Sequence, residues 1–458
     1  MPPAAATGPR PSPQAAYAQW IDACTAAGWR GTPAAEPVPV SGALGRVTAA
    51  PVRARWPSPR SDCAAMDGIA VSAGPADAGG PADAAGRWQL PASAFAWVDT
   101  GDPLPDGTDT VVERERVQFD AHGGAQITGP APRGLNVRAR GEDFQSGQLL
   151  IPAGHRLRPA DLAAAAAAGH AALEAARRPV AAIIPTGDEI RPAGSALGPG
   201  EVTDSNSVLL ALRAGEAGAR PLVSDVQPDD PDALAAELRR AAPAADLVLV
   251  IAGSSAGRSD HTAAVIGQAG GVAVRGVAVR PGHPVLLGHV GLDGMRAGQS
   301  GRPSAAVPVI GVPGYPLAAA VIFELFAVPL LAALQGGRPP DRVWQRVQLA
   351  TDWTSSPDVE DWVPVSLTGP TPAAGPASPA GPASPASAPV GLDDAGAVLA
   401  TPGRGGAGGI SRLVRAHAWW PVPIGQGKFA RGEHIDVQLI PGAPPIASQR
   451  PAGIEGER

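Results

Sequence analysis

Residues 245–260, which read A-D-L-V-L-V-I-A-G-S-S-A-G-R-S-D, constrain the fold of this chain more than any other stretch. The apolar run at 247–251 is rich in valine and short for a helix, which predicts a buried parallel strand. A loop of small residues follows, and it can turn backbone N–H groups toward an anion. Its members are Gly253, Ser254, Ser255 and Gly257. Asp260 then precedes an expected helix at 261–269. The pattern predicts a ligand site at the carboxyl end of an α/β sheet, while an ordinary turn with Asp260 as a helix N-cap fits it equally well.

Strand-like and helix-like segments alternate around this stretch for about 160 residues, which predicts a doubly wound sheet with helices on both faces. The expected strands are 179–186, 221–226, 247–251, 271–284 and 308–311. Three helices are expected: one from the N-cap signal at 204–207 to residue 217, one at 232–242 and one at 317–335. Glu189 follows the first strand, and parallel strands of one sheet end at the same edge. We therefore expect Glu189 and Asp260 to converge.

The remaining segments predict smaller domains on either side of this sheet. Residues 14–27 have the spacing of an amphipathic helix, residues 42–140 alternate short β-like runs with turns, and 161–176 is alanine-rich and expected to be helical. Short strands expected at 343–351, 362–367, 410–417 and 435–440 suggest a small C-terminal β-domain whose sheet packs Trp419 and Trp420. The expected domains are a disordered tail at 1–13, domain I at 14–45 and 141–178, domain II at 46–140, domain III at 179–340 and domain IV at 341–445. The Pro/Ala/Ser-rich stretch 369–389 interrupts domain IV and is expected to be a mobile loop.

Composition excludes several classes of protein. The 36 Lys and Arg against 42 Asp and Glu give a net charge of −6, which argues against a general nucleic-acid binder. The two cysteines, Cys24 and Cys63, are too few for a disulfide scaffold and are expected to be buried thiols. The apolar segment 307–334 is interrupted by prolines and Glu324, so we expect no membrane span. These features predict a soluble, cytoplasmic protein.

Several motifs agree in order and spacing with one known family. They are A-A-M-D-G-I-A-V (64–71), T-G-D-P-L-P-D-G-T-D-T-V-V (100–112), R-G-E-D (140–143), P-T-G-D-E-I (185–190), D-S-N-S (204–207), P-D-D-P (228–231), G-S-S-A-G-R-S-D (253–260), R-P-G-H-P (280–284) and G-V-P-G-Y-P (311–316). In this order the chain resembles molybdopterin molybdenumtransferases, the MoeA and gephyrin E-domain family, in a variant that pairs P-G-Y-P with S-S-A-G. The resemblance covers roughly residues 14–340.

The resemblance implies an elongated homodimer of four-domain protomers that inserts molybdate into adenylylated molybdopterin and releases AMP with Mg²⁺. It places the active site in a cleft between the α/β domain of one subunit and domain II of the other. Molybdopterin adenylyltransferase and molybdoenzyme apo-proteins are the implied partners, with no nucleic acid and no membrane. The implied catalytic residues are Asp67, Thr100, Asp143, Glu189 and Asp260, of which Glu189 and Asp260 would hold the metal. The implied cofactor-binding residues are Gly253, Ser254, Ser255, Gly257, Asp229, Arg275, Arg280, His283, Pro313, Gly314 and Pro316.

The chain departs from the family at its cations. The first family lysine falls on Gly276 beside Arg275, the second on Arg280, and the third on His283. Two other functions therefore stay open. One is a molybdopterin adenylyltransferase or nucleotide pyrophosphatase relative, against which the motifs around Asp67 and Thr100 argue. The other is a molybdopterin-binding or oxyanion-sensing protein without transferase activity, which the missing lysines suggest.

Overall fold

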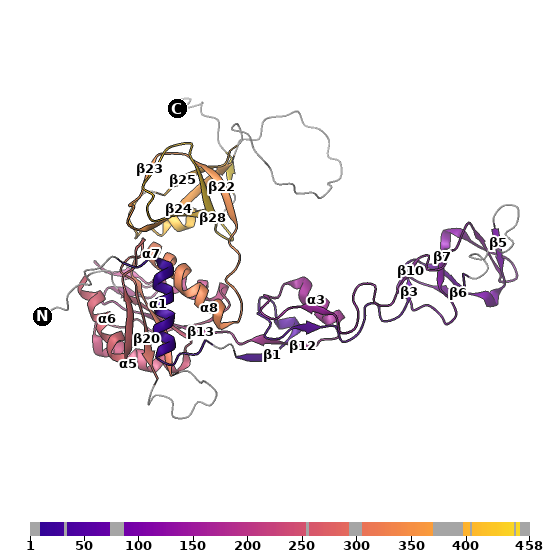
Figure 1. The fold of residues 1–458 in the computed structure, drawn as a ribbon, viewed down its shortest axis with the longest axis horizontal. Coiled ribbons are helices and arrows are strands. Elements are labelled where there is room, and N and C mark those ends of the chain that lie inside the picture. The colour runs from indigo at the N-terminus through magenta and orange to yellow at the C-terminus, as the bar shows by residue number, and fades with distance from the viewer. Residues whose placement is uncertain are drawn as a thin grey trace. The chain divides into compact units, whose positions relative to one another are not determined.

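The computed structural model describes residues 10–31, 34–73, 87–252, 256–292, 305–369, 397–403, 405–443 and 446–448, with the backbone alone at 256–260 and 447–448 (Figure 1). The chain forms two compact units. One combines Met1–Thr32 with Arg178–Arg458, and the other is Pro33–Arg177. The first unit holds the predicted α/β domain and the C-terminal β-domain.

A six-stranded sheet in the order β16-β13-β17-β21-β20-β18 forms the centre of the first unit. The four strands β13 (Val180–Pro185), β16 (Arg220–Val223), β17 (Leu247–Ala252) and β21 (Ala306–Pro313) are parallel. The strands β20 (Leu286–Gly291) and β18 (Gly270–Arg275) add an antiparallel edge. The predicted strand at 271–284 is observed as β18 and the two-residue strand β19 (Val279–Arg280), with a turn between them, and β20 was not predicted. Its sequence L-L-G-H-V-G has little local strand preference, so its pairing with β21 decides its conformation.

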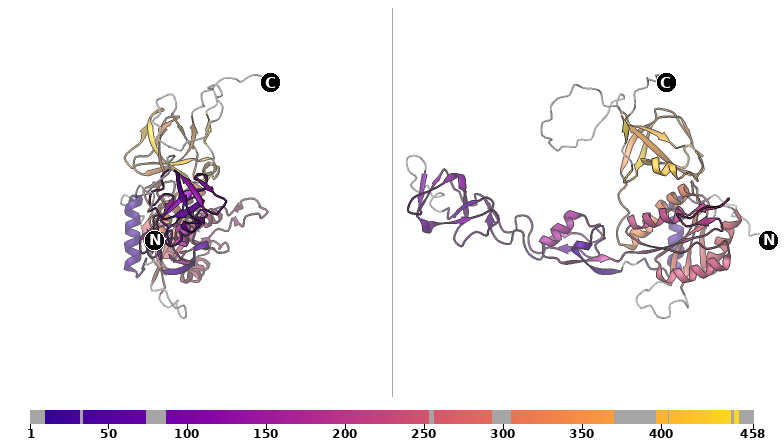
Figure 2. Two further views of the ribbon diagram at one scale, coloured as in Figure 1. Left: turned by 90° about the vertical axis from the view of Figure 1, so that its right-hand side faces the viewer. Right: turned by 180° about the vertical axis from the view of Figure 1, so that it is seen from behind.

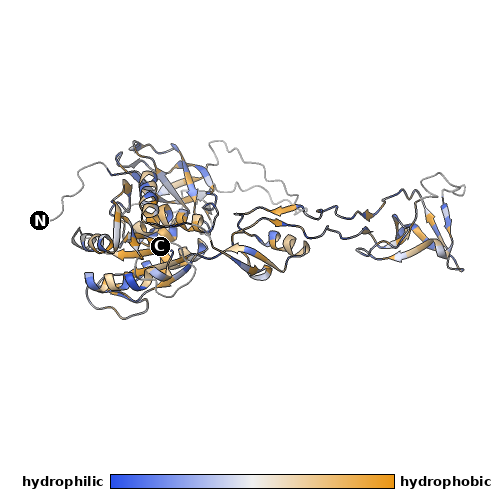
Figure 3. Cartoon of the chain, turned by 60° about the horizontal axis from the view of Figure 1, so that its bottom comes forward, coloured by the Kyte–Doolittle hydropathy of each residue, from blue (hydrophilic) through white to orange (hydrophobic). Residues whose placement is uncertain are grey.

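Helices cover both faces of this sheet, as expected for a doubly wound fold (Figures 1 and 2). Ile183 and Leu249 face α1 (Pro13–Ala26), α4 (Asn206–Glu216) and α7 (Pro316–Ile322). The neighbouring residues Ile184 and Val250 face α5 (Pro231–Ala241) and α6 (Ala256–Ala269). Alternate residues of a strand point to opposite faces, so an unbroken apolar strand can serve both layers. Figure 3 shows the hydrophobic residues gathered on these strands and helices.

Helix α1 packs on the sheet rather than on the segment that follows it. Trp20 is fully buried, and its indole N–H donates to the Gly288 carbonyl at 2.7 Å. The expected domain I at 14–45 is therefore divided between the two units, because the apolar face of α1 finds its partner in β20 and β18. The expected burial of Cys24 and Cys63 is confirmed.

The predicted helix at 317–335 is observed as α7, a π-helical turn at Phe323–Ala327, and α8 (Val328–Leu334). Pro329 explains the turn, because it cannot donate to the Leu325 carbonyl and its ring crowds that carbonyl. By length and composition alone, Pro316–Leu334 could cross a membrane, but 67% of its most apolar window is buried. Phe323 and Phe326 lie in the core, where burying each side chain stabilises the fold by about 1.5–3 kcal/mol.

The C-terminal β-domain closes into a barrel-like sheet. Its strands are β22 (Trp344–Leu349), β24 (Glu360–Gly369), β25 (Leu399–Pro402), β26 (Ala418–Val422) and β28 (His434–Leu439). Closure follows because β26 pairs with both β28 and β24. Trp420 packs inside against Phe429 and Trp353, as expected. The expected strand at 410–417 is wrong: Ser411–Arg415 is the short helix α9, whose Leu413 packs on the α/β core. Most of the Pro/Ala/Ser-rich stretch lies outside the described residues.

The second unit is rich in β-structure, as predicted for residues 46–140. Strand β4 (Gly68–Val71) lies between β6 (Phe95–Val98) and β7 (Thr110–Glu113), and a second small sheet joins β5 (Arg87–Leu90), β9 (Ala125–Thr128) and β8 (Val117–Phe119). The expected helix at 161–176 is wrong in its second half. Helix α3 (Pro159–Ala167) ends near Gly169, which has a φ of +96°, and β12 (Ala172–Ala176) then pairs with β1 (Ala35–Pro39).

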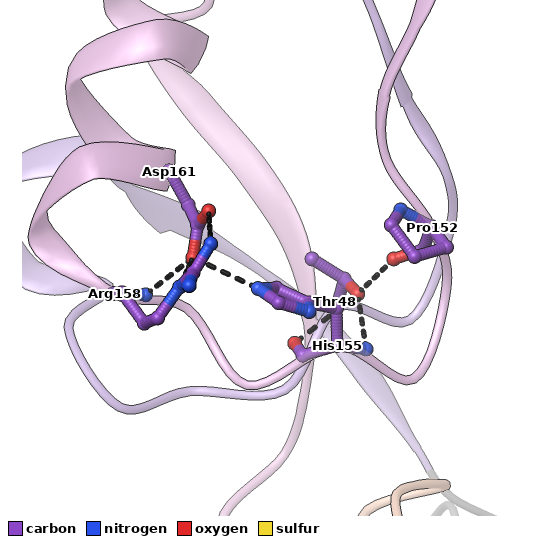
Figure 4. A network of polar contacts seen from close by, with 5 residues as sticks. All are labelled: Thr48, Pro152, His155, Arg158 and Asp161. Carbon is purple, nitrogen blue, oxygen red and sulfur yellow. Dashed lines mark hydrogen bonds and ion pairs between the residues drawn. The ribbon is translucent and has the colours of Figure 1, made fainter. Parts of the chain in front are cut away.

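A polar network fixes the start of α3 (Figure 4). Asp161 accepts from the backbone N–H of Arg158 at 2.8 Å and pairs with its guanidinium, and His155 Nε2 lies 2.8 Å from the same carboxylate. The Arg158 side chain, followed by His155, holds the pKa of Asp161 well below its usual range. Thr48 Oγ1 joins the network by accepting from the His155 N–H at 3.0 Å. These contacts tie the helix to the neighbouring chain segments.

Candidate functional site

The loops that carry the sequence motifs meet at the carboxyl edge of the six-stranded sheet. Pro185 pairs beside Ile251, and Ala252 pairs with Pro313, so the segments after β13, β17 and β21 are neighbours. The connection from β18 to β20 reaches the same edge, because Leu286 lies opposite both Arg275 and Gly311. The chain leaves β13 for β16 on one side and returns to β17 on the other. Such a switch point is where open α/β sheets bind ligands.

Glu189 lies at this edge, held close to an unusual glycine. Gly187 has a φ of +144°, and its N–H donates to the Gln227 carbonyl at 3.0 Å. A Cβ built on Gly187 would lie 2.7 Å from Ile190 Cγ1 and 3.0 Å from Glu189 Oε2. The half-buried Glu189 carboxylate therefore folds back over a position that has room only for glycine.

The neighbouring acidic residues have distinct roles. Asp230 caps α5, because its carboxylate accepts from the N–H groups of Asp232 and Ala233 at 3.3 and 3.2 Å. Asp230, and not Asp229, is therefore the helix cap. Asp229 is exposed instead, and its N–H donates to Asp188 Oδ1 at 3.2 Å. Asp229 therefore places an exposed carboxylate in the loop after β16.

A hollow of about 330 Å³ opens beside these residues. Its walls include Thr186, Asp229, Asp230, Ala252, His261 and Thr262. Thr186 Oγ1 donates to the Ile251 carbonyl at 3.0 Å, which ties the end of β13 to β17. Sequence reasoning missed Thr186, His261 and Thr262. The available signal was their position, because Thr186 ends a predicted strand and His261 and Thr262 follow Asp260.

Helix α6 begins at Ala256, five residues earlier than expected. Gly257 thus lies in the first turn and Asp260 in the second, so Asp260 is not an N-cap. The first N–H groups of a helix have no partner within it, and they suit an anion. Gly253, Ser254 and Ser255 lie outside the described residues, as does the side chain of Asp260.

The cationic positions differ in how they are held. Arg275 is exposed at the end of β18. Gly276 has a φ of +77°, and a Cβ there would lie 3.1 Å from the His283 carbonyl, so the turn disfavours a side chain at the family's lysine position. Partial burial and the nearby Arg10 lower the pKa of His283. Both effects favour the neutral form of the His283 ring. Arg280 forms an ion pair with Asp361 of the C-terminal β-domain.

The P-G-Y-P segment also borders the edge. The Gly314 carbonyl accepts from Asn206 Nδ2 at 2.7 Å, Pro313 ends β21, and Pro316 begins α7. Leu317 N–H donates to the Ala407 carbonyl at 3.2 Å. The C-terminal β-domain therefore contacts the start of α7 directly.

In the second unit, Asp67 and Thr100 come together. Asp67 Oδ1 accepts from both the backbone N–H and the Oγ1 of Thr100, each at 2.7 Å. The Thr100 hydroxyl, then its N–H, lower the pKa of Asp67, and Arg114 adds to the effect. Asp143 lies on the R-G-E-D turn with its N–H bonded to the Ser58 carbonyl at 3.0 Å. Within the described part of the unit, no hydrogen bond or ion pair joins Asp143 to the Asp67–Thr100 pair.

Comparisons with known proteins agree with this architecture. Residues 12–169 match the family model of the MoeA N-terminal region (domain I and II), and residues 182–333 match that of a probable molybdopterin binding domain. A molybdopterin molybdenumtransferase of Nostoc sp. is 31% identical over 309 residues, which are 64% of this chain and 68% of the relative. Molybdopterin molybdenumtransferase 2 of Mycobacterium tuberculosis is 32% identical over 338 residues, covering 69% and 80%. The solved molybdopterin biosynthesis MoeA protein from Pyrococcus horikosii is 27% identical, with a TM-score of 0.73 over 93% of this chain and 98% of that chain. The chain therefore belongs to the molybdopterin molybdenumtransferase family of molybdenum cofactor biosynthesis.

Proposed function

We propose that this protein inserts molybdate into adenylylated molybdopterin and releases AMP. The observation that carries this proposal is the carboxyl edge of the sheet, where carboxylates, an exposed arginine and the start of α6 lie together. The substrate pyrophosphate and the molybdate are both anionic. These anions need hydrogen-bond donors, which backbone N–H groups and arginine can supply. The carboxylates would instead bind the proposed cation.

Mg²⁺ is the proposed metal, and the donor chemistry fits it. The carboxylates of Glu189 and Asp260 are hard oxygen ligands, and Mg²⁺ is commonly held by one or two carboxylates together with substrate phosphates. Within the described ranges, no group of three or more His, Cys, Asp or Glu side chains could hold a metal alone. When bound, the cation would neutralise charge on the pyrophosphate.

We further propose a cytoplasmic homodimer in which both units contribute to catalysis. Asp67 and Thr100 of one subunit would act with Glu189 and Asp260 of the other, with Asp143 nearby. The hydrogen bonds from Thr100 keep Asp67 ionised and fixed in direction, so it can orient a cationic or N–H-bearing part of the substrate. A molybdopterin adenylyltransferase would supply the substrate, and molybdoenzyme apo-proteins would receive the product.

The test is a single assay with purified protein and adenylylated molybdopterin. AMP release and metal loading of the pterin are measured with molybdate or tungstate, with and without Mg²⁺. We expect both signals together. AMP release without metal loading would instead identify a nucleotide pyrophosphatase, and oxyanion binding without AMP release would identify a sensor.

Two variants sharpen this assay. Asp260→Asn and Glu189→Gln should each lower turnover by roughly two orders of magnitude, as expected when a group that stabilises transition-state charge is lost. Added Mg²⁺ should restore part of the activity, and the melting temperature should change little. Near-normal turnover of both variants at low Mg²⁺ would remove these residues from the metal site.

A further inference from the structure

The C-terminal β-domain reaches the carboxyl edge at Arg280. The short strand β19 (Val279–Arg280) pairs in parallel with the start of β24, which places Arg280 opposite Asp361. Glu360 N–H donates to the Ala278 carbonyl at 2.9 Å and secures the same pairing. The backbone of Arg280 is thus held by a strand from another domain.

Asp361 also holds the side chain of Arg280. It is only 4% exposed, and it accepts from Arg280 Nε at 3.3 Å and from the same guanidinium's NH2 at 2.5 Å. Ser355 Oγ donates to Asp361 Oδ2 at 2.7 Å. A buried carboxylate with both oxygens engaged cannot turn away, and a two-point contact fixes the plane of a guanidinium.

The rest of this guanidinium is accessible. The Arg280 side chain is 49% exposed, and Asp361 occupies two of the five N–H bonds that a guanidinium carries. The turn after Arg280 is fixed too, because Gly282 has a φ of +117° and packs where a Cβ would lie 2.8 Å from Ile322 Cδ1. Arg280 is therefore held in place with its remaining N–H donors accessible, at the edge where the anionic substrates are proposed to bind.

We propose that Asp361, supported by Ser355, is a positioning residue that orients Arg280 toward the oxyanion, an inference that rests on the proposed function. The ion pair is neutral overall, so Arg280 contributes directed hydrogen bonds more than net charge. A free arginine would have to be ordered when the anion binds, at a cost equivalent to roughly two- to tenfold in affinity. Because Asp361 already orders the arginine, binding of the anion does not carry that cost.

The experiment compares molybdate binding, measured by titration calorimetry, with KM and kcat for molybdate in the transfer assay. Asp361→Asn should weaken molybdate binding and raise KM by roughly two- to tenfold, with kcat at saturating molybdate nearly unchanged. Simple electrostatics predicts the opposite sign, because removing a negative charge beside Arg280 should tighten anion binding. Ser355→Ala should change KM in the same direction by a smaller factor.

A matched control separates positioning from damage to the domain. Val363 lies two residues further along β24, is 2% exposed, and packs in the barrel core. Val363→Ala should lower the melting temperature and leave molybdate binding and KM unchanged. Unchanged or tighter molybdate binding in Asp361→Asn, or an equal loss in Val363→Ala, would overturn the positioning role. Molybdate binding that depends on Asp361 in a protein that releases no AMP would refute the proposed transferase activity alone.

Discussion

Gly187→Ala tests whether the placement of the Glu189 carboxylate controls the chemistry. The new Cβ would meet Ile190 Cγ1 at 2.7 Å and Glu189 Oε2 at 3.0 Å, whereas ordinary Cβ contacts begin near 3.4 Å. Both neighbours must move away, so the carboxylate should shift by about half an ångström. A misplacement of about 1 Å can cost about a hundredfold in rate. We therefore expect turnover to fall by roughly 10- to 100-fold.

The same substitution has a cost in stability. Alanine at a φ of +144° adds strain of about 1–3 kcal/mol to the folded state. For a unit of this size each kcal/mol corresponds to about 2–4 °C, so the melting temperature should fall by about 2–12 °C. The protein should still be folded at assay temperature, and circular dichroism checks this.

Gly194→Ala is the matched control. Gly194 also has a left-handed φ, +89°, but a Cβ there would meet nothing within 4 Å. This variant carries backbone strain without moving Glu189, so its melting temperature should fall while turnover per folded molecule stays near that of the unmodified protein. Equal turnover in Gly187→Ala and Gly194→Ala, with Glu189→Gln also active, would refute a catalytic role for the carboxylate.

Three further predictions concern the dimer, the Pro/Ala/Ser-rich stretch and acid stability. Inactive Asp67→Ala and inactive Asp260→Ala chains, when mixed, should recover part of the AMP release by forming one intact site per dimer; no recovery after verified exchange of subunits would contradict the shared site. Deletion of residues 375–386 should leave melting temperature and turnover nearly unchanged, because closure entropy depends only slowly on loop length; a large loss of either would show that the stretch packs on the protein. The depressed pKa of Asp161 stabilises the second unit above its unfolded pKa of about 3.9, and that stabilisation is lost as pH falls through the folded value. The melting-temperature difference between the unmodified protein and Asp161→Asn should therefore shrink as the pH falls below about 4, and a constant difference would argue against this ionisation.

Local patterns alone were enough to predict the central parallel strands of the sheet. The apolar runs at 180–185 and 247–252 are buried on both faces, and a chain segment of that composition and length has few alternatives to a central parallel strand. The capping signal before α4 was also correct, because such a signal bonds an N–H group only three residues away. The order of the motifs identified the family for the same reason, since each motif is a short local turn.

Only the tertiary structure decided which of these local pieces meet. Asp67 and Thr100 are 33 residues apart, and Arg280 and Asp361 are 81 apart, yet each pair shares hydrogen bonds. The strand β20 and the packing of α1 on the sheet likewise depend on surfaces supplied by distant segments. The spacing of apolar residues encodes which face of an element is buried, but it does not encode the surface that will cover that face. That choice is made by the packing of the whole chain, so the sequence by itself determined the central parallel strands and the family, and the fold determined the partners of each side chain.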